Sequence, residues 1–257
     1  MRYVLPFREG GSVPALVEAD DSGMYVTKLR GASQGARALV AELVSGELAR
    51  AVGLAVPELV LVEVDRALAD SEPDPELATP LEASAGINLG LDYLPGSITF
   101  DAVAGPVPDA RTASRIVLFD AFVMNVDRTP RNPNLLVWHG RIWLIDHGAS
   151  LYFHHGWGPA TAQEGTGDPF VETKSHVLLP WAKALPAAAA HLAAALTPAA
   201  IDAVIAQIPQ AWLASDGHSG FADEASHRAA YGGWLRARVS AIPVILEEAE
   251  RARALLV

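Results

Sequence analysis

The chain has 257 residues, 51% of them hydrophobic, and a formal net charge of -11. This length accommodates one large domain or two small ones, with enough apolar residues for a core. The charge disfavours nucleic acid as a partner, because phosphate backbones repel an acidic chain. There is no cysteine, so disulfides and thiolate metal sites are excluded.

The N-terminal residues MRYVLPFREGG contain several charges and do not resemble a signal peptide. No stretch approaches the roughly 20 uninterrupted apolar residues that a membrane helix requires. We therefore expect a cytoplasmic protein that neither spans a membrane nor binds one.

The first third of the sequence predicts short strands and one helix. Val13–Ala19 and Met24–Leu29 are rich in strand-forming residues, and the Asp-Asp-Ser-Gly sequence between them predicts a hairpin turn. Strong helix formers with apolar residues at helical spacing predict a helix over Ala36–Val52. Glu58–Val64 is a further predicted strand.

The middle of the chain predicts a boundary between two lobes. Residues 67–85 are rich in Asp, Glu, Pro and Ser and are interpreted as a surface excursion. Ile87–Leu94 predicts a strand that ends at Pro95-Gly96. We therefore expect an N-lobe over residues 1–94 and a C-lobe over residues 95–257.

The second part of the sequence predicts mainly helices. Ala110–Met124 has the pattern of a buried helix, and Thr197-Pro198 is a typical helix start. Asn134–Trp138 and Arg141–Ile145 are predicted strands joined by a tight turn. Trp234–Val257 predicts a final helix or helix pair. The fold class is thus α+β, with a small strand-rich lobe followed by a larger helical lobe.

Residues 125–148 contain the most informative group of polar side chains. Asp127 follows the long apolar helix, Asn132 lies five residues later, and Asp146 ends the second predicted strand. A hairpin between them would bring the two carboxylates and the amide together. Mg²⁺ prefers such oxygen ligands, and an aspartate can accept the proton of an acceptor hydroxyl. We predict Asp127 as catalytic base, with Asn132 and Asp146 as metal ligands.

Asp and Asn are also common in loops because they cap local turns. Any one of Asp127, Asn132 and Asp146 alone would be interpreted as a residue that caps a local turn. Asn134 competes with Asn132 for the metal role, since it lies in the same segment.

Asp-x-x-x-x-Asn, a hairpin and then Ile-Asp-x-Gly resemble the catalytic and metal-binding loops of the protein-kinase superfamily. The local form Asn-x-Asp-Arg-x-x-x-Asn resembles the HipA-like kinases and, more distantly, the phosphoinositide kinases. The resemblance implies a bilobal protein-kinase-like fold, ATP and Mg²⁺ as cofactors, and the roles predicted above for Asp127, Asn132 and Asp146. His147 stands where many kinases have phenylalanine.

The resemblance also implies roles in the first lobe. Lys28, on a predicted strand, matches the lysine that contacts ATP phosphates, and Glu42, on the following helix, matches its ion-pair partner. Either residue by itself could simply be solvent-exposed. Gly10, Gly11 and Ser12 could cover the phosphates with backbone N–H groups. The stretch from Gly31 to Gly35 is a rival phosphate loop because it precedes a helix.

Two further segments are interpreted through the same resemblance. Asp92, Tyr93 and Leu94, at the lobe junction, would form the hinge that contacts adenine. Residues 156–168 would form a mobile activation-type segment, with Thr161 and Thr166 as possible phosphorylation sites.

The sequence therefore predicts an ATP-dependent phosphotransferase, with a protein serine or threonine as acceptor by analogy. A pseudokinase, which would hold nucleotide and act through partners, is one alternative. The other alternative is a metal-dependent phosphohydrolase using Asp127 and Asp146, which leaves Lys28 and Glu42 unexplained.

Overall fold

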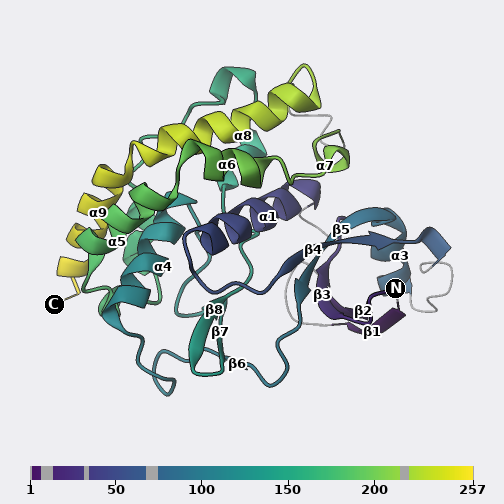
Figure 1. Cartoon of the computed structure of the whole chain (residues 1–257), viewed down its shortest axis with the longest axis horizontal. Helices are drawn as coiled ribbons and strands as arrows, with labels where there is room; N and C mark the ends of the chain where they lie inside the picture. The colour runs from purple at the N-terminus through teal and green to yellow at the C-terminus, as the bar shows by residue number, and fades with distance from the viewer. Residues whose placement is uncertain (1, 7–13, 32–34, 68–74, 215–219, 257) are drawn as a thin grey trace.

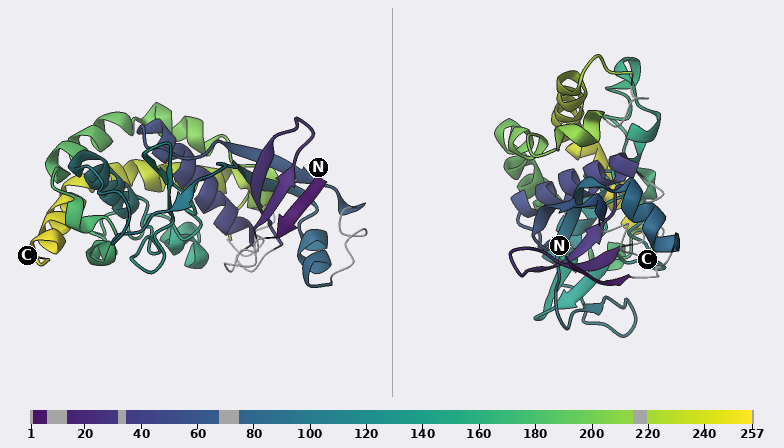
Figure 2. Two further views of the ribbon diagram at one scale, coloured as in Figure 1. Left: turned by 90° about the horizontal axis from the view of Figure 1, so that it is seen from below. Right: turned by 90° about the vertical axis from the view of Figure 1, so that its right-hand side faces the viewer.

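The computed structural model describes residues 2–6, 14–31, 35–67, 75–214 and 220–256. A small sheet-rich part contains most of the N-terminal strands, and a larger helical part contains the C-terminal half of the chain (Figure 1). The two parts lie at opposite ends of an elongated molecule (Figure 2). This mixed architecture confirms the predicted fold class.

The sheet-rich part contains an antiparallel sheet in the order β1-β2-β3-β5-β4. Its strands are β1 (Arg2–Pro6), β2 (Ala15–Glu18), β3 (Met24–Lys28), β4 (Leu59–Val64) and β5 (Gly86–Asp92). The hairpin β2–β3 confirms the first predicted turn, in which Asp21 Oδ1 accepts a hydrogen bond from the Gly23 amide at 2.8 Å. Strand β3 lies between β2 and β5, so its last residue, Lys28, is held within the sheet.

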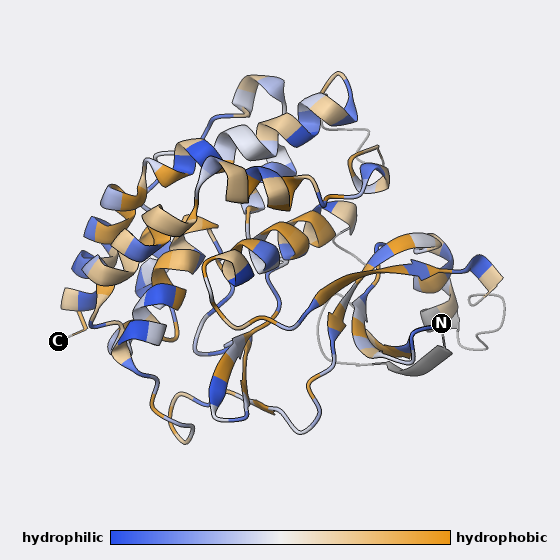
Figure 3. Cartoon of the chain, in the orientation of Figure 1, coloured by the Kyte–Doolittle hydropathy of each residue, from blue (hydrophilic) through white to orange (hydrophobic). Residues whose placement is uncertain are grey.

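Helix α1 (Gly35–Ala51) lies between the sheet and the helical part, which it contacts through α6 and α7 (Figure 1). It is buried on nearly all sides, and apolar residues run along both α1 and β4 (Figure 3). A helix packed on several sides needs no polar face. Gly53, with a φ of 75°, ends α1 as the sequence predicts, because the left-handed conformation strains other residues.

The surface excursion predicted over residues 67–85 is wrong in part. Residues 75–83 form helix α3 (Pro75–Ala83), which contains Pro80. Leu81 is buried in a small apolar cluster with Leu29 and Val64. Burial of this one side chain against the sheet stabilises a helix in a segment whose composition is typical of a loop.

A three-stranded sheet begins the second half of the fold, in the order β6 (Ile98–Thr99), β7 (Leu135–Trp138) and β8 (Arg141–Leu144). The turn between β7 and β8 has positive φ angles at His139 and Gly140, as expected for a two-residue hairpin turn. The hairpin predicted from the sequence is confirmed. Strand β6 was not predicted.

The helical part is built from α4 to α9, with short 3₁₀ turns between α4 and α5. The α-helices are α4 (Ala110–Phe122), α5 (Leu185–Ala195), α6 (Pro198–Ile205), α7 (Gln210–Ala214), α8 (Glu224–Val239) and α9 (Ile242–Ala254). Asp109 caps α4 by accepting hydrogen bonds from the Arg111 and Thr112 amides. Thr197 caps α6 through Ala200 N, which confirms the predicted helix start.

One apolar cluster runs from α1 through α4 to the C-terminal helices. Helix α1, which the sequence assigns to the N-lobe, therefore shares its core with the helical part. The lobe boundary at residue 94 stays a prediction. Within the described residues, no single helix is long and apolar enough to cross a membrane, although α5 and α6 together pass that test with a 69° bend between them.

Candidate active site

Lys28, Glu42 and Asp146 meet between the five-stranded sheet and the helical part. Lys28 Nζ donates to Glu42 Oε2 and to Asp146 Oδ1, both at 2.6 Å. Lys28 comes from the end of β3, Glu42 from the middle of α1, and Asp146 from the residues that follow β8. The structure thus brings together one predicted nucleotide contact, its ion-pair partner and one predicted metal ligand.

Burial and charge determine the ionisation of this group. Burial alone would lower the pKa of Lys28, but the carboxylates of Glu42 and Asp146 outweigh it and raise that pKa. Burial alone would raise the pKa of Glu42, but Lys28 and the neighbouring His147 outweigh it and lower that pKa to about 2. An ammonium and a carboxylate are therefore both charged inside the protein at neutral pH.

The Asp146 carboxylate is only partly covered, with 44% of its side chain exposed. Its backbone has a φ of 55°, a left-handed conformation that a non-glycine residue adopts only where its surroundings enforce it. Oδ1 is held by Lys28, and Oδ2 has no hydrogen-bond partner among the described residues. One oxygen is thus fixed by the protein while the other is open to a ligand.

Asp127 is held by the two asparagines that competed for the metal role. Its Oδ2 accepts hydrogen bonds from Asn132 Nδ2 at 2.6 Å and from Asn134 Nδ2 at 3.2 Å. Asn132 is exposed, whereas Asn134 is buried and has a φ of 48°. Each side-chain amide donates its N–H group to Asp127, which leaves its side-chain oxygen, Oδ1, for another partner. Both remain compatible with the metal role that the sequence assigns to Asn132.

Arg128 connects the loop of Asp127 to the strand that leads to Asp146. Its Nε donates to Asp120 Oδ2 at 2.5 Å, and its Nη1 donates to the carbonyl groups of Asn134 and Ile145. Both Arg128 and Asp120 are fully buried. The sequence analysis included Arg128 only as the arginine of the Asn-x-Asp-Arg motif and assigned it no role.

Asp120 carries a second partner that sequence reasoning also missed. His176 Nε2 lies 2.9 Å from Asp120 Oδ2. Burial alone would raise the pKa of Asp120, but Arg128 and His176 outweigh it and lower that pKa to about 2. The aspartate follows an apolar helical run, where an isolated carboxylate requires a partner, and this was the available signal.

Comparisons with known proteins agree with this geometry. A family model described as HipA-like kinase matches residues 3–230. The chain belongs to the HipA-like kinase family. Among solved structures, the HipA-like fold described here is similar to the crystal structure of the Helicobacter pylori proinflammatory kinase CtkA. That similarity has a TM-score of 0.60 and 12% sequence identity, and it covers 97% of this chain and 96% of CtkA. No curated protein sequence matches significantly.

His147 of this HipA-like kinase takes the place at which many kinases have phenylalanine. The ring is fully buried and packs edge-on against Phe119, with ring centroids 6.5 Å apart. Its Nδ1 lies 3.7 Å from Glu42 Oε1, and neither ring nitrogen has a hydrogen-bond partner within the described residues. His147 therefore fills the space behind Glu42 and, unlike a phenylalanine, presents a ring nitrogen to that carboxylate.

The other predicted nucleotide contacts of the HipA-like kinase stay predictions. Gly10, Gly11 and Ser12 lie outside the described residues, as does most of the rival Gly31–Gly35 loop. Asp92 is the last residue of β5, and Tyr93 and Leu94 follow it toward the second part of the molecule, with the Tyr93 amide donating to Met24 O at 2.9 Å. Leu94 is buried, and Asp92 and Tyr93 are exposed. Their contact with adenine stays a prediction.

The segment predicted to be mobile, residues 156–168, is attached to α8 at several points. Trp234 Nε1 donates to Glu164 O at 2.9 Å. Arg238 Nη1 donates to Asp168 O and to Thr166 O, and its Nε and Nη2 donate to the Phe122 and Ala121 carbonyl groups. Burial lowers the pKa of Arg238 to about 10. Arg238 therefore ties this segment to the end of α4, directly before the loop of Asp127.

The hydroxyl groups of the predicted phosphorylation sites form only local hydrogen bonds within the described residues. Thr161 Oγ1 accepts a hydrogen bond from Gly158 N at 2.9 Å, and Thr166 Oγ1 donates to Gln163 O at 3.1 Å.

His154, which precedes this segment, is buried with Nδ1 3.0 Å from Tyr231 Oη. Burial lowers the pKa of His154 well below its usual value, so this ring is neutral at physiological pH.

Proposed function

We propose that this HipA-like kinase transfers the γ-phosphoryl group of ATP to a serine or threonine hydroxyl of a protein in a Mg²⁺-dependent reaction. The observation that carries the proposal is the meeting of Lys28, Glu42 and Asp146 at 2.6 Å contacts. Phosphoryl transfer by protein kinases requires a strand lysine paired with a helix glutamate, together with an aspartate that holds Mg²⁺. The Lys28–Glu42 pair and the adjacent Asp146 match these requirements in type and position.

The residues fit a magnesium ion. Asp146 Oδ2 and the side-chain oxygen Oδ1 of Asn132 are hard oxygen donors with no hydrogen-bond partner among the described residues. Mg²⁺ needs few protein ligands beside phosphate and water oxygens, so one carboxylate and one amide suffice. Bound Mg²⁺ would offset the negative charge of the phosphates during transfer.

Asp127 is suited to the role of base. Two amide N–H groups hold its Oδ2, and its Oδ1 has no hydrogen-bond partner among the described residues. Oδ1 would accept the proton of the acceptor hydroxyl, while the two asparagines fix the orientation of the carboxylate. Lys28 would bind ATP phosphates, and Glu42 would keep its ammonium group in place.

The decisive experiment follows transfer from γ-labelled ATP by the full chain, with mass spectrometry of all protein present. We expect Asp127→Asn to lower the transfer rate by about 10²- to 10⁴-fold, the usual contribution of a general base. Binding of Mg-ATP, followed by thermal shift, should stay within about twofold of the parent chain, because Asp127 acts on the acceptor.

Three results would contradict the proposal. Binding of Mg-ATP by the parent chain without transfer would favour a nucleotide-binding module. Release of phosphate from a phosphoester without ATP would favour a hydrolase. An unchanged rate of transfer in Asp127→Asn would show that Asp127 is not the catalytic base.

A further inference from the structure

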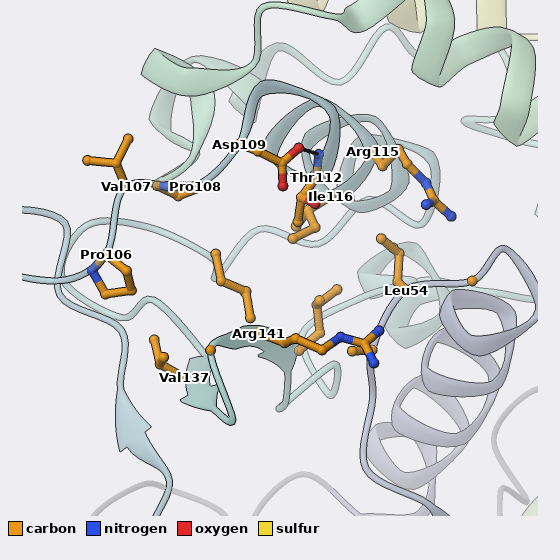
Figure 4. Close-up of a pocket in the computed structure, with 15 residues that line it drawn as sticks. Leu54, Pro106, Val107, Pro108, Asp109, Thr112, Arg115, Ile116, Val137 and Arg141 are labelled. Atoms are coloured by element: carbon orange, nitrogen blue, oxygen red, sulfur yellow. Dashed lines mark hydrogen bonds between the residues drawn. The ribbon is translucent and has the colours of Figure 1, made fainter.

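A cavity of about 460 Å³ lies between the exit of α1, the start of α4 and the β7–β8 hairpin (Figure 4). Polar atoms form the larger share of its surface, and apolar side chains line the rest, among them Leu54, Ile116, Val137, Ile142 and Leu144. None of the residues proposed for phosphoryl transfer lines it. Its volume lies in the range of pockets that hold small organic molecules.

Two arginines supply the positive charge of this cavity. Figure 4 shows Arg115 and Arg141 extending from opposite walls, with their guanidinium groups on the side where Leu54 lies. Neither arginine forms an ion pair with a carboxylate in the described part of the chain. In a chain with 30 acidic and 19 basic residues, two unpaired guanidinium groups at one cavity are a local excess of positive charge.

Each guanidinium group keeps donors that its present contacts do not use. Arg115 Nη2 donates to the Val52 carbonyl group and lies 2.9 Å from His191 Nε2, but its Nε is buried without a hydrogen-bond partner. Arg141 packs over the Trp143 ring at 5.9 Å and is exposed. A cation–π contact leaves the N–H groups of a guanidinium group free for an anion.

One carboxylate lines the cavity, and it is already engaged. Asp109 Oδ1 accepts hydrogen bonds from the Arg111 amide at 3.0 Å and the Thr112 amide at 2.9 Å. The Thr112 side chain and the Thr112 and Arg111 amides lower the pKa of Asp109, so it stays ionised at the start of α4. It forms no ion pair with either arginine in the described part of the chain, and two guanidinium groups against one carboxylate leave the lining with a net positive charge.

We propose that this cavity binds a small organic anion, with its acid group between Arg115 and Arg141 and its apolar body against Leu54, Ile116 and Val137. This inference does not depend on the proposed kinase activity. An aromatic or aliphatic carboxylate or phosphate ester has the required combination of charge and apolar surface.

The test is an NMR titration of the ¹⁵N-labelled full chain, without ATP, with 4-phenylbutyrate and 4-phenylbutylamine. These probes share one apolar body and carry opposite charges. We expect 4-phenylbutyrate to shift amide signals of Leu54, Thr112 and Ile142, and to bind at least about tenfold more tightly than the amine.

Variants of the exposed arginine test its role without disturbing the fold. Arg141→Gln should weaken 4-phenylbutyrate binding by about tenfold, and Arg141→Lys should weaken it less, because the charge is kept. Arg251→Gln on α9 removes a guanidinium group far along the chain from the cavity and should leave binding unchanged. Arg115→Gln should also weaken 4-phenylbutyrate binding. This variant is interpreted only if its circular dichroism spectrum matches that of the parent chain.

The inference is overturned if 4-phenylbutyrate shifts no signal from the cavity walls, or if both probes bind equally. Equal binding by the parent and Arg141→Gln would also overturn it. Shifts confined to Lys28 and its neighbours would place the anion at the proposed phosphate site instead. None of these results bears on phosphoryl transfer, which is measured separately.

Discussion

Lys28 Nζ lies 2.6 Å from Asp146 Oδ1, although 118 residues separate the two along the chain. Lys28 belongs to the five-stranded sheet, and Asp146 follows the hairpin of the second sheet. The same ammonium group is 2.6 Å from Glu42 Oε2 on α1. The Lys28 ammonium group therefore joins β3, α1 and the residues after β8. Removal of Lys28 or of either carboxylate should change the stability of the protein and the rate of transfer.

Glu42→Gln should destabilise the protein and lower the rate of transfer. The substitution removes the buried partner of a buried cation, and such losses typically lower the free energy of unfolding by about 3–5 kcal/mol. Chemical denaturation and transfer from labelled ATP measure the two effects. Glu47→Gln on the same helix, in a partly exposed pair with Arg50, is the control and should change stability by less than about 1 kcal/mol. Similar stability of both variants would contradict the importance of the buried pair.

The roles of Asn132 and Asn134, the two asparagines that hold Asp127, can be distinguished by the Mg²⁺ dependence of transfer in variants of each. Asn132→Ala should raise the Mg²⁺ concentration for half-maximal transfer by more than about tenfold, because it removes the proposed ligand oxygen. Asn134→Gly removes the other amide and still permits the positive φ of this position. We expect only a small change in Mg²⁺ dependence for Asn134→Gly. The reverse order of effects would assign the metal to Asn134.

Arg128 should act as a positioning residue for transfer. Arg128→Lys keeps the charge near Asp120 but loses the forked contacts to the Asn134 and Ile145 carbonyl groups. We expect kcat to fall by about tenfold or more with little change in the KM for ATP. Arg131→Lys, an exposed substitution in the same loop, is the matched control. Equal kcat and KM values for the two variants would show that Arg128 does not position the loop of Asp127 for transfer.

Stability should decrease in acid because two buried carboxyl groups have lowered pKa values. The folded-state pKa values of Glu42 and Asp120 are about 2, below their usual values of 4.5 and 3.8. Around pH 3 the unfolded chain binds more protons, so their contribution is present above about pH 4.5 and is lost as the pH falls through about 2.

Urea denaturation from pH 6 to pH 2 measures this dependence. Glu42 alone should contribute on the order of 3 kcal/mol, given about 1.4 kcal/mol for each unit of pKa difference. The Glu42→Gln variant should therefore show a flatter dependence on pH between about 4.5 and 2. An identical slope for parent and variant would contradict the buried ion pair.

Local sequence patterns were sufficient for many of the elements. The hairpin β2–β3, the Gly53 end of α1, the β7–β8 hairpin and the Thr197 cap all depend on residues within a few positions of each other. Turn and cap chemistry acts over that range. Helix α3 was missed because its stabilising contact is made with Leu29 and Val64, far along the chain. A loop-like composition could not reveal that contact.

The sequence by itself predicted the side chains that we propose for phosphoryl transfer, since Lys28, Glu42, Asp127, Asn132 and Asp146 match the family motifs by type and order. Only the tertiary structure decided how they meet and what supports them. The Lys28–Glu42 pair was predicted from the sequence and is confirmed, whereas the Lys28–Asp146 ion pair and the His176–Asp120 contact join segments that are distant in sequence. Because burial makes an unpaired charge unfavourable, packing of the sheet and helices selects these partners, and no local pattern encodes them.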